Sequence, residues 1–480
     1  MIRTEIDGVP VLWERGPEPM TAALVFRVGA RDETFRTTGV THLIEHLVMA
    51  SLDRSPLDRN AMVDLNSTVF HATGRPEAVV DFINRVCAAL SDLPLGRLEK
   101  ESRVLRAEEG IAEHPALAVA LCARYGYRAQ GLAGAAGPGP EQLSRTHVVD
   151  HARRYFTRAN AVLVLSAEPP PGLRIALPDG TRPELAVAPH LDLRLPGRVT
   201  ADHPVVSLSG LVTVPHAASM TAQVLVGRLE DELRDARGLS YEVSSGGAPT
   251  VEDETMVAVW ADGRDDDLPA VAEAMWRAVA RLAGSGPTEP ELAHALDVAR
   301  EDLDDPRSIV GWLVHQAVRL LMGREPRSRS DQRSLDGLVD AEQVRRAATQ
   351  IRDSALLYVP DKPVELPDVP DISDDDHPTG APLGDTVFRK KALAFAPRDL
   401  AVHIGDDGIS LTAAGTTSSA TWPEVVGVAE LPGAREVVIG DGRVLPVIAK
   451  HLRGGERLVS LIDERAGGLL FTPEPEGPED

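Results

Sequence analysis

The spacing of apolar residues predicts that strands and helices alternate through the first 165 positions. Residues 76–93 carry apolar side chains three and four positions apart, which is typical of an amphipathic helix, and residues 98–108 predict a second helix. Short apolar runs bounded by turn residues predict strands. These strands are expected at 9–13, 22–28 and 160–165. The first part of the chain is therefore expected to be a mixed unit of sheet and helices, at 1–170.

A similar order of strands and helices is expected in a second unit at 196–360, after a segment rich in proline and leucine. Thr288 and Glu291 form a capping box, which predicts that a helix begins there. The other elements expected in this unit are strands at 205–214, 239–245 and 256–261 and helices at 219–233 and 268–282. The chain therefore repeats one plan twice.

A third and smaller unit is expected at 384–472, beyond an acidic, proline-rich linker at 361–383. Its pattern predicts short alternating strands and a final helix at 456–466. Asp441-Gly442 predicts a hairpin turn between two of these strands.

The charge of the chain narrows the range of partners. The formal net charge is −23 at pH 7, which argues against nucleic acid and against anionic membranes as partners. Cys87 and Cys122 lie among apolar residues, so we expect buried thiols rather than a disulfide. The N-terminus has no apolar signal core and no run approaches the length of a membrane span. These features predict a cytoplasmic protein.

The segment His42-Leu-Ile-Glu45-His46 contains a candidate metal-binding and catalytic motif. On a helix, residues three and four apart are neighbours, so the three polar side chains share one face. Two imidazoles on consecutive turns can hold one zinc ion, and a carboxylate beside them can accept a proton from water. This His-x-x-Glu-His order is the inverted zincin motif. A solvated polar face is the alternative interpretation of the same five residues.

A zinc site in a hydrolase usually has a third protein ligand, and the helix expected at 98–108 carries carboxylates that could provide it. Glu101 and Glu108 are two helical turns apart and point almost the same way. With the motif upstream, the run Glu101-Ser102-Arg-Val-Leu-Arg-Ala-Glu108 resembles the pitrilysin family, which includes insulinase and the mitochondrial processing peptidase. The resemblance implies that His42, His46 and Glu108 bind Zn²⁺, that Glu45 is the catalytic base, and that Glu101 supports the site. The family often has arginine where Ser102 stands.

The resemblance continues on both sides of the motif. Asn60-Ala61 matches the edge strand on which the family receives its substrate as an added β-strand. A turn role for Asn60 is the alternative. The segment before Asn60 is shorter than in the family, which we interpret as a trimmed surface helix. In the second unit, Arg234 and Tyr241 match a pair that reaches the substrate in the family, where the tyrosine helps to hold the oxyanion. A helix-end arginine and a packed tyrosine are the alternative.

The resemblance covers roughly residues 1–360 and implies an α+β fold, with two related α/β rolls that face each other. The third unit, with Trp422-Pro-Glu and a final helix, looks like a pleckstrin-homology-type β-barrel. The implied function is that of a zinc metalloendopeptidase that holds peptides in a closed chamber, with trimming of a leader or signal peptide as one conceivable task. Short members of the family act as dimers, so a homodimer or a heterodimer with a related chain is expected. The alternatives are a non-catalytic partner subunit and a peptide-binding or docking protein.

Overall fold

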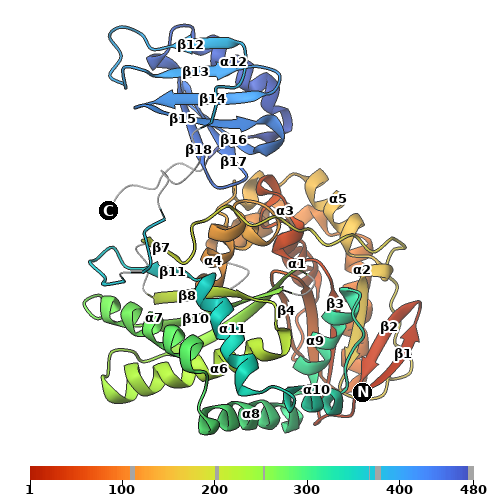
Figure 1. Cartoon of the computed structure of the whole chain (residues 1–480). Helices are drawn as coiled ribbons and strands as arrows, with labels where there is room; N and C mark the ends of the chain where they lie inside the picture. The colour runs from red at the N-terminus through yellow and green to blue at the C-terminus, as the bar shows by residue number, and fades with distance from the viewer. Residues whose placement is uncertain (109–113, 201–204, 252–253, 367, 373–379, 474–480) are drawn as a thin grey trace.

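The computed structural model of the 480-residue chain describes residues 1–108, 114–200, 205–251, 254–366, 368–372 and 380–473. It contains two α/β halves and a smaller C-terminal unit above them (Figure 1). Within the described residues, no helix is both long enough and apolar enough to cross a bilayer. The mixed α+β class expected from the sequence is confirmed.

The first half is built on a six-stranded sheet in the order β1-β2-β6-β3-β5-β4. Its strands are β1 (Ile2–Ile6), β2 (Val9–Trp13), β3 (Met20–Phe26), β4 (Asp58–Val63), β5 (Thr68–Gly74) and β6 (Ala161–Leu165). Its helices are α1 (Val40–Ser51), α2 (Pro76–Ser91), α3 (Leu98–Ala107), α4 (Pro115–Tyr125) and α5 (Arg145–Tyr155). Apolar residues of α1, α2 and α5 form one core with one face of the sheet, as their spacing predicts.

The second half has a five-stranded sheet in the order β7-β11-β8-β10-β9. Its strands are β7 (Gly197–Thr200), β8 (Val205–Val212), β9 (Val243–Val251), β10 (Glu254–Asp262) and β11 (Leu356–Val359). Its helices are α6 (Pro215–Leu229), α7 (Leu268–Ser285), α8 (Glu289–Asp304), α9 (Ile309–Leu321), α10 (Arg329–Asp336) and α11 (Ala341–Asp353), and a π-helical segment, η7 (Glu230–Ala236), prolongs α6. The strand expected to begin at Leu239 begins at Val243, because the residues between η7 and β9 turn around Asp262.

Five strands of the first sheet, all but β1, have the topology of the second sheet. In the first, β2 pairs with β6 in parallel, and the following pairs β6–β3, β3–β5 and β5–β4 are antiparallel. In the second, β7–β11 is parallel, and β11–β8, β8–β10 and β10–β9 are antiparallel. The internal repeat expected from the sequence is confirmed at the level of strand order, and it places β4 and β9 at equivalent sheet edges.

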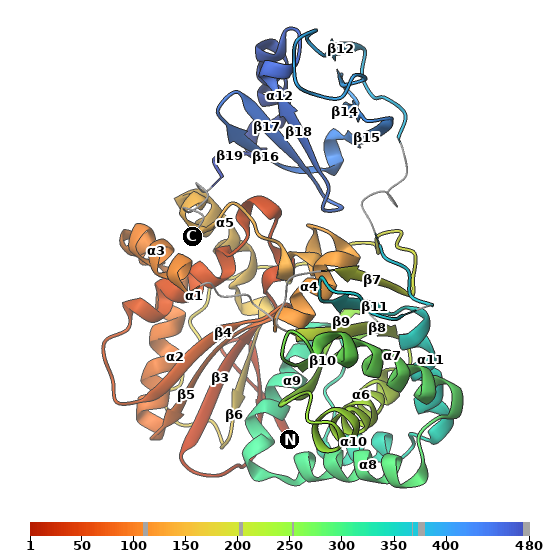
Figure 2. The same cartoon turned by 90° about the vertical axis from the view of Figure 1, so that its left-hand side faces the viewer.

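One helix of each half packs against the sheet of the other half. Apolar residues of α4 pack with Met256, Ala258 and Trp260 of β10. In return, Leu313 and Ala317 of α9 pack against the face of the first sheet that α1 and α2 leave uncovered. Figure 2 shows α9 beside β6 and α4 beside the second sheet. The exchange joins the halves through two apolar interfaces, so the expected boundaries at 170 and 196 do not separate two independent cores.

The C-terminal unit contains two four-stranded sheets rather than a closed barrel, which corrects the expectation of a β-barrel. The sheets have the orders β12-β13-β14-β15 and β18-β17-β16-β19, and α12 (Gly455–Ala466) shares their core. Trp422 and Pro423 form a short 3₁₀ turn between β15 and β16, and proline lacks the N–H that a continued ladder needs. The strands are β12 (Thr386–Arg389), β13 (Ala401–Ile404), β14 (Gly408–Ala413), β15 (Thr416–Thr421), β16 (Val425–Leu431), β17 (Ala434–Ile439), β18 (Val444–Ile448) and β19 (Leu470–Phe471).

This unit packs on the first half close to the start of α1. Ala429, Val438 and Phe471 form an apolar cluster with Phe35 and Leu132. The contact is fixed by a hydrogen bond from the N–H of Tyr127 to the carbonyl of Gly440, at 2.8 Å. In the linker before the unit, residues 367 and 373–379 lie outside the described part of the chain.

Candidate metal centre

Helix α1 carries His42, Glu45 and His46, and its N-terminus is held by a carboxylate from outside the helix. Gly39 caps the helix with a φ of 86°, a left-handed conformation that glycine adopts readily. The side chain of Glu33 accepts hydrogen bonds from the N–H groups of Gly39, at 2.7 Å, and Thr41, at 2.9 Å. These are donors that the first turn of a helix leaves unpaired, so Glu33 fixes where α1 begins.

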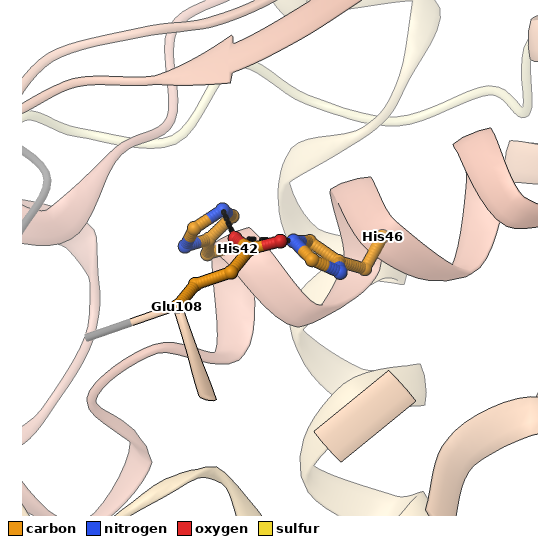
Figure 3. A group of neighbouring side chains, drawn as sticks. All are labelled: His42, His46 and Glu108. Carbon is orange, nitrogen blue, oxygen red and sulfur yellow. Dashed lines mark hydrogen bonds and ion pairs between the residues drawn. The ribbon is translucent and has the colours of Figure 1, made fainter. Parts of the chain in front are cut away.

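Glu108 meets the two histidines from the end of α3. It is the C-cap residue of that helix, and its Oε2 lies 3.2 Å from Nε2 of His46 and 3.8 Å from Nε2 of His42. One ligand atom from each of the three residues lies within 4.8 Å of the others. Figure 3 shows the carboxylate of Glu108 between the two imidazoles. We call His42, His46 and Glu108 the metal group.

The metal group fits zinc in chemistry and in spacing. Two imidazole nitrogens and one carboxylate oxygen are a ligand set of hydrolytic zinc sites, which keep a fourth position open. Ligand atoms around one tetrahedral zinc ion are about 3.4 Å apart. The two Glu108 distances, 3.2 and 3.8 Å, bracket that value. The side chain of Glu108 is 48% exposed, so the group is open to solvent on one side.

Glu45 lies beside the metal group. Its Oε2 is 3.6 Å from Nε2 of His42 and 3.8 Å from Nε2 of His46, and the residue is buried. Burial and the charge of Glu108 raise the pKa of Glu45 to about 7. Burial and the neighbouring His46 lower the pKa of His42 to about 4, so its imidazole is neutral at neutral pH, as a metal ligand must be.

Glu101, which the resemblance gives a supporting role, bonds to an arginine in the structure. It is buried on α3, and its Oε1 accepts hydrogen bonds from Nε of Arg97, at 3.2 Å, and from Nη2, at 3.0 Å. Within the described residues, it makes no hydrogen bond to the metal group. Its expected role stays a prediction, with Arg97 as its direct partner.

Asn60 and Ala61 lie on β4, which ends the first sheet and has β5 as its paired neighbour. Asn60 is exposed, and its Oδ1 accepts a hydrogen bond of 2.9 Å from the N–H of Ala61. A main-chain donor at a sheet edge normally bonds to another strand or to water. The side chain of Asn60 therefore satisfies a donor that a further strand would otherwise take.

Arg234 and Tyr241 come from the second half, where the structure leaves both exposed. Arg234 belongs to η7, and Tyr241, 82% exposed, belongs to the segment before β9. Oδ1 of Asp262 accepts hydrogen bonds from the Tyr241 N–H and the Ser240 hydroxyl, both at 2.8 Å, so the main chain at Tyr241 is fixed. Neither side chain bonds to another described residue. The structure does not bring this pair into contact with the metal group.

Arg31 is a buried residue of the turn at 29–33, and the sequence assigned it no role in the site. It is 0% exposed, and its guanidinium donates to Asn66 of the first half and to the carbonyl oxygens of Ala186 and Thr250. It therefore ties the segment before α1 to the second half at Thr250. The available signal was the run Arg31-Asp-Glu33 between a strand and an apolar helix, because three consecutive charges are rarely buried unless each is paired.

Neither family models nor the curated proteins give a match to this chain, whereas solved structures do. A protease from Helicobacter pylori is 14% identical, with 75% of this chain and 99% of that chain covered at a TM-score of 0.61. A peptidase M16 inactive domain from Pseudomonas fluorescens is 18% identical, with 76% and 99% covered at a TM-score of 0.58.

A chain of complex III2 from Candida albicans is 14% identical, with 74% of this chain and 94% of that chain covered at a TM-score of 0.58. At these identities the likeness concerns the fold alone. With the repeated sheet topology, it shows that the chain has a peptidase M16-like fold.

Proposed function

We propose that this protein is a zinc-dependent endopeptidase. The observation that carries the proposal is the metal group: two imidazoles and a carboxylate from separate helices converge within 4.8 Å, with Glu45 beside them. The peptidase M16-like fold supports it. A solvated polar face, the alternative interpretation, does not account for Glu45, which is buried among the same side chains.

In this proposal, His42, His46 and Glu108 hold the ion, and each remaining residue has one task. Zinc, when bound, supplies a Lewis acid that polarises a carbonyl oxygen and makes a water more acidic. Glu45 accepts a proton from the attacking water and returns it to the departing amine. Its position between His42 and His46 supports this role, with 3.6 and 3.8 Å to their Nε2 atoms.

The proposed substrate is an extended peptide, such as a leader segment, that adds as a strand to β4. Main-chain hydrogen bonds at a sheet edge bind a peptide with little demand on its sequence. The position of β4 at the edge of the sheet, as far as the described residues go, supports this mode, in which the bond from the Ala61 N–H to Asn60 would be exchanged for one to the substrate. Arg234 and Tyr241 would contact the substrate from the second half, which their exposure permits.

A second candidate function is that of a non-catalytic subunit that pairs with an active relative. It is favoured by two of the structural neighbours, a domain labelled inactive and a chain of the multi-subunit complex III2. The metal group and Glu45 favour catalysis, because a subunit without chemistry has no need for all four residues in one place. In either case a second chain, identical or related, would complete the chamber.

The experiment that separates the two functions starts from purified full-length protein. Its zinc content is measured, and its cleavage of a mixture of unstructured peptides is followed by mass spectrometry before and after chelation. Cleavage that is lost on chelation and restored by zinc supports the peptidase. Protein that cleaves no peptide alone but increases cleavage by a related active chain supports the subunit.

A further inference from the structure

The loop between β12 and β13 exposes two large apolar side chains at the surface of the C-terminal unit. Leu393 is 100% exposed and Phe395 is 101% exposed, the highest values among the large hydrophobic residues that are described. The loop has internal order, because the N–H of Ala394 bonds to the carbonyl of Lys391 at 3.1 Å. These side chains are therefore held out in solvent by a structured turn.

Basic residues surround this apolar pair on the loop and on the segment next to it. Residues 386–398 contain four basic residues and no acidic one. The loop is joined to the segment before α12 by the bond from the Lys391 N–H to the His451 carbonyl, at 2.9 Å, and by an isolated bridge between Lys390 and Leu452. We call the whole set the basic tip: Arg389, Lys390, Lys391, Leu393, Phe395, Arg398, Lys450, Arg453 and Arg457.

The charge of the basic tip is unlike that of the rest of the chain. The chain has a net charge of −23 and five lysines, of which Lys390, Lys391 and Lys450 belong to the tip. No basic side chain of the tip forms an ion pair with any described residue, whereas many arginines elsewhere on the surface are paired. The positive charge is therefore available to an external partner.

The basic tip also lies far from the rest of the molecule. The C-terminal unit contacts the first half through Ala429, Val438 and Phe471. Both views show β12, which leads into the loop, at the opposite end of the unit from the two halves (Figures 1 and 2). A flat surface could approach the tip without meeting the two halves.

We propose that the basic tip binds the surface of a membrane that contains anionic lipids. Lysine and arginine are attracted to anionic headgroups, and Leu393 and Phe395 would enter the boundary between headgroups and acyl chains. A protein partner would have to provide a pocket for each protruding side chain, whereas a lipid interface admits both without one. The net charge of the chain predicted no such partner, but the field near a surface is set by charges within a Debye length, about 8 Å in physiological salt.

Vesicle sedimentation with the full-length protein tests this proposal. Vesicles of equal parts phosphatidylcholine and phosphatidylglycerol should sediment the protein, and vesicles of phosphatidylcholine alone should not. The double variant Leu393→Ser/Phe395→Ser should bind about tenfold more weakly, since it removes the apolar contact. The double variant Lys390→Glu/Lys391→Glu should lose at least about tenfold, and added salt should weaken the wild type.

Matched controls keep the result specific to the tip. Leu338→Ser removes another exposed leucine, 71% exposed, and Lys362→Glu reverses another lysine; both should bind like the wild type. Absence of binding to anionic vesicles overturns the proposal, as does equal binding by wild type and tip variants. Tip-dependent binding to polyglutamate without binding to vesicles also overturns it, in favour of an acidic protein partner.

Discussion

Oε2 of Glu108 lies 3.2 Å from Nε2 of His46, although the two residues are 62 positions apart in the chain. The relationship depends on the contact between α1 and α3, in which Leu105 packs into the core that α1 shares. Two carboxyl groups, those of Glu108 and Glu45, therefore lie beside the same pair of imidazoles. A divalent cation would balance this arrangement.

Removal of one ligand should lower the affinity for zinc more than removal of an outer partner does. His42→Ala, His46→Ala and Glu108→Gln should each lower the affinity for zinc by more than the roughly 10–100-fold that is caused by substitutions outside the ligand set. Competition titration with a zinc-sensitive dye measures this affinity. Glu99→Gln, an exposed glutamate on the same helix as Glu108, is the matched control and should bind like the wild type. Unchanged affinity in all three ligand variants would refute the assigned ligands.

Substitution in the second half should change turnover and leave the metal in place. Tyr241→Phe removes a hydroxyl that we propose to hold the oxyanion, and should lower kcat by about tenfold or more. Arg234→Ala should also lower kcat/KM, because the exposed guanidinium would no longer reach the substrate. Steady-state kinetics, with zinc content as a parallel readout, check both variants. Arg237→Ala, a nearby exposed arginine, is the control, and loss equal to that of Arg234→Ala would contradict a specific role.

Proline at Ala61 should weaken substrate binding without disturbing the sheet. The N–H of Ala61 bonds to Oδ1 of Asn60 and not to β5, so its removal breaks no ladder bond. If a substrate strand uses this donor, Ala61→Pro should raise KM about three- to tenfold, the scale of one hydrogen bond. Ala61→Ser retains the N–H and serves as the control. An unchanged KM in the proline variant, with zinc retained, would argue against strand addition at β4.

Glu291 should stabilise the protein at neutral pH and lose this effect in acid. Arg228 donates two hydrogen bonds to Glu291, at 2.7 and 2.9 Å, and Thr288 donates others. These bonds outweigh the opposite effect of burial and lower the pKa of Glu291 from 4.5 to about 2. Because the folded pKa is the lower one, the stabilisation is complete above about pH 4.5 and disappears as the pH falls towards 2.

Glu291→Gln should therefore cost about 0.5–1 kcal/mol in the free energy of unfolding at neutral pH, the scale of a partly exposed ion pair. Thermal melts of wild type and variant should converge as the pH is lowered. Glu289→Gln, an exposed neighbour in the same helical turn, should show no such dependence. A constant difference in melting temperature across this range would contradict the linkage.

Many elements of the two halves could be predicted from the sequence because their apolar spacing and caps are distinct. The apolar spacing located α2 and β6, and the capping box at Thr288 located the start of α8. The exchange of α4 and α9 could not be predicted, because an apolar helix face does not identify the sheet that it covers. The barrel expected in the C-terminal unit was wrong for a similar reason: strand spacing does not determine whether a sheet closes.

The candidate site also has residues that could be predicted from the sequence and residues that could not. His42, Glu45 and His46 could be placed together from helical geometry, since they lie within five positions. The inclusion of Glu108 came from a resemblance, and in the structure its Oε2 lies 3.2 Å from Nε2 of His46. The cap that Glu33 forms on α1 and the hydrogen bond from Arg31 to Thr250 could not be predicted. They depend on contacts between segments that a local sequence pattern does not relate.

The measurement that tests the central claim most directly compares the wild type with Glu45→Gln at full zinc occupancy. The substitution keeps the size of the side chain and removes its ability to accept a proton, while His42, His46 and Glu108 remain. We predict equal zinc content, retained peptide binding, and a cleavage rate lower by a factor on the order of 10² or more. Equal cleavage rates for the two proteins would contradict the account, because the proton would then be carried by another group.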